Sequence, residues 1–173
     1  MKKVVAIITA RGGSKRIPRK NIKEFCGEPI IKYPIRAAIE SGVFDEVMVS
    51  TDDEEIREIA ESCGASCPFM RDAENANDFA TTVDVIKEVL TKYKEIGHVF
   101  THYCVIYPTA PFVTAEKLRT AFQILEENRA DFLTPVVRYD YPVQRCFVIK
   151  NGTLKKKWPE YQNVRTQDGT SIL

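Results

Sequence analysis

The fold is decided by the stretch Lys3-Val-Val-Ala-Ile-Ile-Thr9, which leads directly into Ala10-Arg-Gly-Gly-Ser-Lys-Arg-Ile-Pro-Arg-Lys-Asn21. The first part is an unbroken run of mostly β-branched apolar residues, the pattern of a strand buried on both faces of a parallel sheet. The second part combines two adjacent glycines with five cationic side chains. Ligands of open α/β sheets bind beyond the carboxyl ends of the strands, so this loop is the first candidate for a site.

Further apolar runs alternate with helical patterns along the first 137 residues. We expect strands at 46–50, 65–70, 103–107 and 131–137, and helices at 29–41, 52–63, 82–96 and 114–128. Three of these helices are followed by a glycine, a common C-terminal signal. The alternation predicts an α/β fold, a three-layer α/β/α sandwich with a mostly parallel sheet and right-handed crossovers.

The pattern changes after residue 137. Residues 138–142 form an aromatic segment, 146–150 a short expected strand, and Asn151-Gly152 a hairpin turn signal. We therefore expect one domain over residues 1–173, with the late segment as an appendage rather than a second domain.

Composition narrows the functional class. The 173 residues are 44% hydrophobic and 28% charged, enough for one core and a hydrated surface. The longest uncharged apolar runs fall far short of the roughly 20 residues that span a bilayer, and the N-terminus lacks a secretory h-region. The odd number of cysteines, five, argues against a disulfide framework. We expect a cytoplasmic protein without a membrane segment.

Charge is distributed unevenly. The net charge of +1 argues neither for nucleic acid nor for an acidic partner, and we expect no nucleic acid to bind. Residues 1–23 nevertheless hold eight Lys or Arg and no acid. Gly12 and Gly13 allow backbone N–H groups to approach a phosphate, and the cations can balance a polyphosphate. The spacing matches neither a Walker A loop nor G-x-G-x-x-G, which disfavours P-loop kinases and dinucleotide dehydrogenases. The alternative is a solvated basic loop.

Two more segments fall at carboxyl ends of expected strands. Val49-Ser-Thr-Asp-Asp53 has the chemistry of a helix N-terminus, with Thr51 or Asp52 as the cap. Tyr107-Pro-Thr-Ala-Pro111 is either a plain turn or a rigid loop that lines a ligand. The two histidines, four residues apart, argue against a nucleophilic triad.

Four ordered motifs resemble the acylneuraminate cytidylyltransferases, and most nearly the pseudaminic acid cytidylyltransferases. They lie at 10–21, 49–53, 68–71 with 78–82, and 107–111, and the resemblance covers essentially residues 2–168. It implies a cytidylyltransferase that transfers CMP from CTP to a nine-carbon nonulosonic acid, pseudaminic acid first among them, and releases pyrophosphate. Such chemistry requires positioning and charge neutralisation rather than a covalent protein nucleophile.

The resemblance also implies roles for individual residues. Tyr107 stands where sialic acid members carry an amide, which favours a pseudaminic-type sugar. The implied catalytic residues are Arg11 and Lys20. The implied nucleotide-binding residues are Arg11, Gly12, Gly13, Ser14, Lys15, Lys20 and Asn21 for the triphosphate, and Arg71 with Thr81 or Thr82 for cytosine; the implied sugar-binding residues are Tyr107, Thr109, Arg165 and Gln167.

By the same resemblance, the chain is a single nucleotidyltransferase domain over 1–173 with a protruding dimer and sugar-site arm at 138–168. The resemblance implies a homodimer and Mg²⁺ as the cofactor that accompanies CTP. Family members continue past this point through an acidic motif that binds Mg²⁺, so we expect a C-terminally truncated chain. Its metal would be held by the triphosphate and by Asp52 or Asp53. The alternatives are a nucleotide-binding homologue without turnover and an enzyme for sialic or another ulosonic acid.

Overall fold

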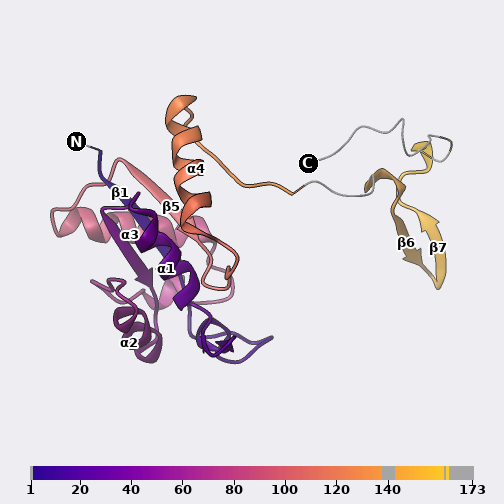
Figure 1. Cartoon of the computed structure of the whole chain (residues 1–173). Helices are drawn as coiled ribbons and strands as arrows, with labels where there is room; N and C mark the ends of the chain where they lie inside the picture. Colours follow the sequence, from indigo (N-terminus) through magenta and orange to yellow (C-terminus); the bar gives the residue numbers. More distant parts are fainter. Residues whose placement is uncertain (1, 138–142, 162, 164–173) are drawn as a thin grey trace. The chain divides into compact units, whose positions relative to one another are not determined.

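The computed structural model describes residues 2–137, 143–161 and 163 (Figure 1). The chain divides into two compact units, Met1–Ala130 and Asp131–Leu173. The first unit holds the main sheet and the four α-helices that the described residues form. The second holds a small hairpin.

The central strand of the first unit is β1, Val4–Thr9. It pairs in parallel with β4, Glu46–Ser50, on one side and with β5, His102–Ile106, on the other. The strand order is β4-β1-β5. The predicted buried parallel sheet is confirmed, and β1 is its middle because its residues can be buried on both faces.

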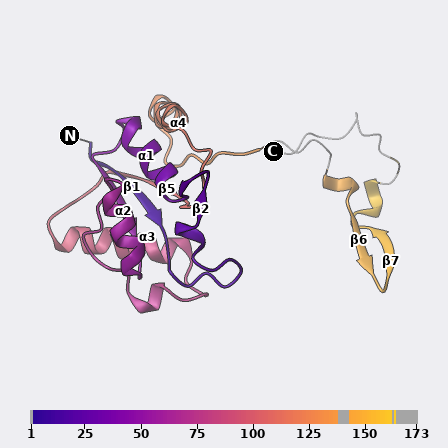
Figure 2. The same ribbon diagram turned by 60° about the horizontal axis from the view of Figure 1, so that its bottom comes forward.

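Helices cover both faces of this sheet. They are α1 (Lys32–Ser41), α2 (Glu54–Ser62), α3 (Thr82–Glu95) and α4 (Ala115–Glu127), each close to its predicted range. Figure 2 shows α1 and α4 on one side of β1 and α3 on the other. The α/β/α sandwich is therefore confirmed.

Alternate residues of β1 enter two separate cores. Ala6 and Ile8 pack with buried residues of α1 and α2. Val5 and Ile7 face the other way and pack with Val89 and other buried residues of α3. This division follows from the two-residue period of a strand, and burial of both apolar sets drives the layers together.

A small antiparallel hairpin delays the start of α1. The strands β2, Glu24–Phe25, and β3, Glu28–Pro29, pair across a turn in which Cys26 has φ 50° and Gly27 has φ 84°. The predicted helix start at residue 29 is therefore wrong by three residues, because Pro29 still belongs to the hairpin. Just before it lies the short 3₁₀ helix η1, Lys20–Ile22.

Two predicted strands are absent from the described structure. The run 65–70 contributes only one parallel bridge, between Met48 and Ser66. Pro68 has no N–H to extend the pairing, and the next bond to this side of the sheet is from the N–H of Arg71 to the carbonyl of Thr51, beyond the end of β4. The run 131–137 is described but forms no strand. An apolar, β-prone run becomes a strand only where a partner supplies hydrogen bonds and packing, and this run has none among the described residues.

The second unit contains the antiparallel hairpin β6, Phe147–Lys150, with β7, Thr153–Lys156. Its turn residues Asn151 and Gly152 both have positive φ, 52° and 74°, as the sequence pair predicts. Three short 3₁₀ helices complete the described elements: η2 (Ala73–Asn75), η3 (Val143–Arg145) and η4 (Pro159–Tyr161). The arm at 138–168 stays a prediction.

No helix in the described ranges combines the length and the apolar character that crossing a bilayer requires.

Candidate functional site

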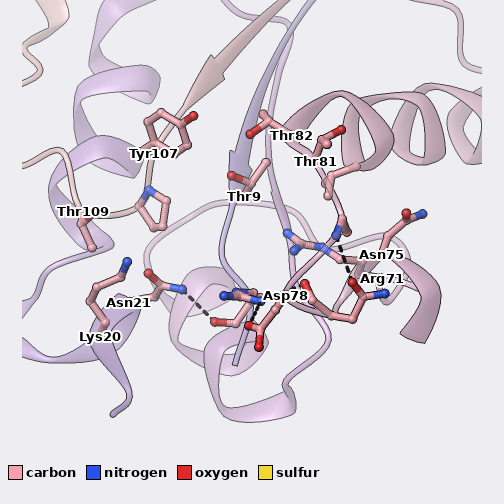
Figure 3. A pocket seen from close by; sticks show the side chains of 15 residues that line it. Thr9, Lys20, Asn21, Arg71, Asn75, Asp78, Thr81, Thr82, Tyr107 and Thr109 are labelled. Carbon is pink, nitrogen blue, oxygen red and sulfur yellow. Dashed lines mark hydrogen bonds and ion pairs between the residues drawn. The ribbon is translucent and has the colours of Figure 1, made fainter. Parts of the chain in front are cut away.

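A cavity of about 240 Å³ opens beyond the carboxyl ends of β1 and β5. Figure 3 shows Lys20, Asn21, Tyr107 and Thr109 on one side, and Arg71, Asn75, Thr81 and Thr82 on the other. Its lining residues come from the end of β1 and the first loop, from the segment before α3 and the first turn of that helix, and from the loop after β5: Thr9, Arg11, Lys20, Asn21, Arg71, Asn75, Asn77, Asp78, Ala80, Thr81, Thr82, Val85, Tyr107, Pro108 and Thr109.

Arg71 is held rigidly at one wall of the cavity. Its Nε donates to Oγ of Ser50 at 3.0 Å and its Nη2 to the carbonyl of Ser50 at 2.6 Å. Its backbone N–H donates to the carbonyl of Thr51 at 2.8 Å. Only 7% of the residue is exposed, and this burial lowers the pKa of the guanidinium. The result is a fixed donor whose direction is set by the end of β4.

Arg11 and Lys15 share one carboxylate, that of Asp78. Nη1 of Arg11 lies 2.8 Å from Oδ1 of Asp78 and also donates to the carbonyl of Asn77 at 2.8 Å, while Lys15 pairs with the other carboxylate oxygen. Hydrogen bonds from Lys15 and Arg11 lower the pKa of Asp78. The Asp78 carboxylate therefore lies between Arg11 and Lys15, two side chains that the sequence predicts to bind phosphate.

Gly12 of the first loop contacts the residues that follow β4, and neither it nor Gly13 lines the cavity. The N–H of Gly12 donates to Oδ1 of Asp52 at 2.9 Å. A Cβ on Gly12 would lie 2.6 Å from Oδ2 of Asp53, so only glycine allows this approach, whereas a Cβ on Gly13 would meet nothing within 4 Å. The N–H of Ser14 bonds to the carbonyl of Gly12 at 2.9 Å. Phosphate binding by Gly12, Gly13, Ser14 and Lys15, none of which lines the cavity, stays a prediction.

Asp53 is the N-cap of α2, which corrects the expectation of Thr51 or Asp52. Its Oδ1 accepts from the N–H of Ile56 at 3.1 Å and from Nη2 of Arg19 at 3.0 Å. The bond with Arg19 lowers the pKa of this carboxyl. Arg19 itself has φ 53° and also pairs with Glu55. The Asp53 carboxylate therefore caps α2 and anchors Arg19 of the first loop.

Metal-ligating side chains are sparse near the cavity. Across the described ranges, no three His, Cys, Asp or Glu residues gather as a cation site would require. Asp53 is engaged by Arg19, while Asp52 uses one oxygen for Gly12. The donor set fits a cation held chiefly by substrate phosphates with one carboxylate, a common mode for Mg²⁺.

The structure distinguishes the two threonines that the sequence left open. Thr81 is the N-cap of α3 and forms a capping box, in which its Oγ1 accepts from the N–H of Asp84 at 3.3 Å and its own backbone N–H donates to the Asp84 carboxylate at 2.9 Å. The Thr81 hydroxyl also donates to that carboxylate at 2.7 Å. These bonds lower the pKa of Asp84. Thr82 begins the helix, and its hydroxyl makes no hydrogen bond among the described residues. Thr82 therefore has the hydroxyl that is available to a ligand.

Lys20 and Asn21 lie in η1 at the opposite wall. Nδ2 of Asn21 donates to the carbonyl of Arg11 at 2.8 Å and ties η1 to the first loop. Tyr107 and Thr109 follow β5 and line the same side. Arg165 and Gln167 lie outside the described residues.

Asn75, Asn77 and Asp78 also line the cavity, although sequence reasoning assigned them no role. Asp78 belonged to a quoted motif, but a single carboxylate opposite a basic loop gives no sequence signal of its contact. The contact depends on the turn before α3, which places these side chains in the cavity wall.

Three comparisons with known proteins agree with this geometry. Residues 5–153 match the family model described as Cytidylyltransferase. The chain is 40% identical over 169 residues to a pseudaminic acid cytidylyltransferase of Campylobacter jejuni, covering 97% of this chain and 73% of that protein. It is 35% identical over 122 residues to a CMP-N,N'-diacetyllegionaminic acid synthase of Legionella pneumophila, covering 70% and 53%.

Among solved structures, the chain is similar to a CMP:2-keto-3-deoxy-manno-octonic acid synthetase complexed with CTP. The TM-score is 0.63 at 26% identity, with 75% of this chain and 49% of that chain covered. The chain thus spans about half the length of that structure. With its fold, its cavity and the family match in agreement, the chain belongs to the cytidylyltransferase family.

Proposed function

We propose that this protein transfers CMP from CTP to a nine-carbon nonulosonic acid, with pseudaminic acid as the sugar, and releases pyrophosphate. The observation that carries the proposal is one cavity that joins the fixed guanidinium of Arg71 to the cations Arg11 and Lys20. The names of the relatives in Campylobacter jejuni and Legionella pneumophila support a nonulosonic acid as the acceptor.

The reaction needs no nucleophile from the protein. The anomeric hydroxyl of the sugar acid attacks the α-phosphorus of CTP and loses its proton to solvent, while the bond from that phosphorus to the bridging oxygen of the β-phosphate breaks and pyrophosphate leaves. Arg11 and Lys20 offset the negative charge that builds on the phosphates, a role that positioned cations fulfil well in a partly enclosed cavity. Arg71 and Thr82 hold the cytosine at the other wall.

The sugar acid occupies the side lined by Tyr107 and Thr109. The Tyr107 phenol can donate or accept a hydrogen bond at this wall. Arg165 and Gln167 are proposed to reach the sugar bound to the neighbouring subunit of a dimer, where Arg165 suits the sugar carboxylate as a bidentate fork.

Mg²⁺ is the metal we propose to accompany CTP. It would be held by the triphosphate and by the Asp52 carboxylate, which lies beside Gly12 at the end of β4. When bound, the ion neutralises phosphate charge and orients the leaving pyrophosphate. We further propose a homodimer in the cytoplasm, tested by light scattering and cell fractionation.

The test is pyrophosphate release by the full chain with CTP and Mg²⁺. The sugar panel contains pseudaminic acid, sialic acid and a 3-deoxy octulosonic acid, and UTP and ATP replace CTP as controls. We expect turnover with CTP and pseudaminic acid. Lys20→Ala should reduce it by at least tenfold, roughly the effect of losing one charge-assisted contact, while Lys23→Ala, outside the cavity, retains it.

Two other results would change the conclusion. Selective CTP binding without pyrophosphate release in a single turnover would support a nucleotide-binding homologue. Turnover with another acid in the panel would reassign the sugar but retain the reaction.

A further inference from the structure

Glu88 of α3 is a buried carboxylate that the proposed mechanism does not use. Only 6% of its side chain is exposed. Its Oε1 accepts from the N–H of Asp72 and from Nζ of Lys92, both at 2.8 Å, and its Oε2 accepts from Nδ2 of Asn75 at 2.6 Å. A carboxylate is buried at such a position only when its partners compensate for the lost water, so these contacts hold Glu88 in one place.

The pair of Glu88 and Lys92 holds the chain on both sides of Arg71. Nζ of Lys92 donates to the carbonyl of Met70 at 2.8 Å and to the carboxylate of Asp72 at 2.8 Å. Glu88 takes the backbone N–H of Asp72. The segment that carries the fixed guanidinium is therefore tied to α3 immediately before and immediately after Arg71.

Glu88 also decides which end of the Asn75 amide is left for the cavity. An ionised carboxylate has only acceptors, so the amide atom 2.6 Å from Oε2 is the nitrogen. Rotating the amide by half a turn would set Oδ1 against Oε2, and two acceptors would face each other. Asn75 lines the cavity, and its Oδ1 accepts no hydrogen bond from the described residues. Asn75 therefore offers the cavity an acceptor.

A donor lies in the same wall. Figure 3 shows Arg71 and Asn75 on one side of the cavity. Nε and Nη2 of Arg71 are bonded to Ser50, which leaves Nη1 without a partner among the described residues. Cytosine complements one donor beside one acceptor, because its acceptor N3 is adjacent to its 4-amino donor. Uracil reverses both groups, with N3–H beside a carbonyl oxygen.

We propose that Oδ1 of Asn75 accepts a hydrogen bond from the 4-amino group of the cytosine base, and that Glu88 is the positioning residue that keeps this oxygen toward the base. The inference rests on the proposed function and deepens it, because it assigns the distinction between CTP and UTP to a side chain. Arg71 supplies the donor of the pair, Asn75 the acceptor, and Glu88 prevents the amide from turning over.

The test uses a ligand that lacks only the amino group. Calorimetry on the full chain measures binding of CTP, UTP, inorganic tripolyphosphate and the triphosphate of pyrimidin-2-one riboside, which is cytidine without its 4-amino group. The proteins are the native chain, Asn75→Ala, Glu88→Gln and Glu127→Gln. Glu127 is the matched control, because its Oε1 also accepts from a side-chain amide, that of Gln123 at 2.6 Å, on α4 and outside the cavity.

The native protein should bind CTP roughly three- to tenfold more tightly than the pyrimidinone nucleotide, the size of one hydrogen bond. Asn75→Ala should lose that factor for CTP, while its binding of the pyrimidinone nucleotide and of tripolyphosphate stays within about twofold. A change in loop structure alone would weaken both nucleotides together. Glu127→Gln should bind every ligand as the native protein does.

Glu88→Gln should narrow the preference for CTP over UTP by a similar factor. Glutamine can donate to Oδ1 of Asn75, so the amide is free to turn its nitrogen toward the base, where the uracil oxygen accepts from it. Circular dichroism checks that each variant is folded. If Glu88→Gln does not fold, Asn75→Ala and the pyrimidinone nucleotide still test the contact.

Three results overturn the proposal. Equal losses for CTP and the pyrimidinone nucleotide in Asn75→Ala would assign the contact to the ribose or to the loop. Unchanged nucleotide binding with a higher KM for the sugar acid would place Asn75 against the sugar. An unchanged CTP preference in folded Glu88→Gln would remove its positioning role. Failure of the native protein to bind CTP selectively would instead refute the proposed function, and this is measured before any variant is made.

Discussion

Oδ1 of Asp78 lies 2.8 Å from Nη1 of Arg11, so a carboxylate of the chain itself neutralises a cation that we propose to bind the triphosphate. Lys15 pairs with the same carboxylate. A triphosphate that binds Arg11 must compete with Asp78 for it. Asp78 therefore partly neutralises the positive charge of the proposed triphosphate site.

Asp78→Asn should strengthen tripolyphosphate binding, because Arg11 and Lys15 lose their internal counter-charge. Roughly a two- to fivefold gain is expected, since these ion pairs are partly exposed to solvent. The measurement is calorimetric titration at low ionic strength. Asp131→Asn removes the same charge outside the first unit and should leave the affinity unchanged; weaker binding to Asp78→Asn would show that Asp78 aids binding instead.

Gly12→Ala should destabilise the protein by about 1–2 kcal/mol, because its Cβ would displace Asp53 and weaken the cap of α2. Urea unfolding measures the loss. Gly13→Ala is the matched control, since a Cβ there meets nothing within 4 Å. Equal stability of the two variants would contradict the close approach of Gly12 to Asp53.

Ser50→Ala should loosen Arg71 without changing the sheet. The variant removes the hydroxyl that accepts from Nε of Arg71 at 3.0 Å and leaves the Ser50 carbonyl in place. We expect CTP affinity to fall by roughly three- to tenfold and the preference over UTP to narrow. Ser66→Ala, which loses a hydroxyl bonded to Glu46 beside the same strand, should keep that preference.

Thr81→Ala and Thr82→Ala should differ in what they impair. Loss of the Thr81 cap is expected to cost about 1 kcal/mol of stability, read from urea unfolding. Thr82→Ala should leave stability nearly unchanged and weaken CTP binding. The opposite pattern would assign the ligand hydroxyl to Thr81.

The Asp53 carboxylate should make stability depend on pH. Arg19 lowers its pKa from the ordinary 3.8, so the charged form stabilises the fold above that value and the contribution is lost as pH falls below it. Asn in place of Asp53 keeps the cap but not the charge. Near pH 7 the free energy of unfolding of the native protein should therefore exceed that of Asp53→Asn by about 1 kcal/mol or less, because the exposure of Arg19 to solvent weakens the ion pair. The difference should close in acid; a gap independent of pH would refute the charge effect.

The layers were predictable because periodicity reports burial directly. The run 4–9 and the four helical patterns each carry their own apolar signal, and all of them formed as elements. The run 131–137 carried a similar signal yet formed no strand, since pairing depends on a partner that local sequence does not specify. The predicted start of α1 at residue 29 was wrong because Pro29 pairs with Glu24 in the hairpin, and the helical pattern carries no signal of that pairing.

The site was predictable as a set of positions but not as a set of contacts. The loop after β1 and the end of β5 both reached the cavity because parallel strands end at the same edge. The pairing of Asp78 with Arg11, and the use of the Gly12 N–H by Asp52, depend on side-chain geometry between distant segments. Neither composition nor motif spacing predicts such pairings.

The position of β1 between β4 and β5 also constrains how the chain is made. A ribosome releases residues 4–9 first, yet their partners follow only at 46–50 and 102–106. Through that interval the most apolar strand of the sheet lacks one or both neighbours and stays open to wrong pairing. Nascent chains stopped before residue 102 should therefore be recognised by holding chaperones, and the sheet can close only after β5 has left the ribosome.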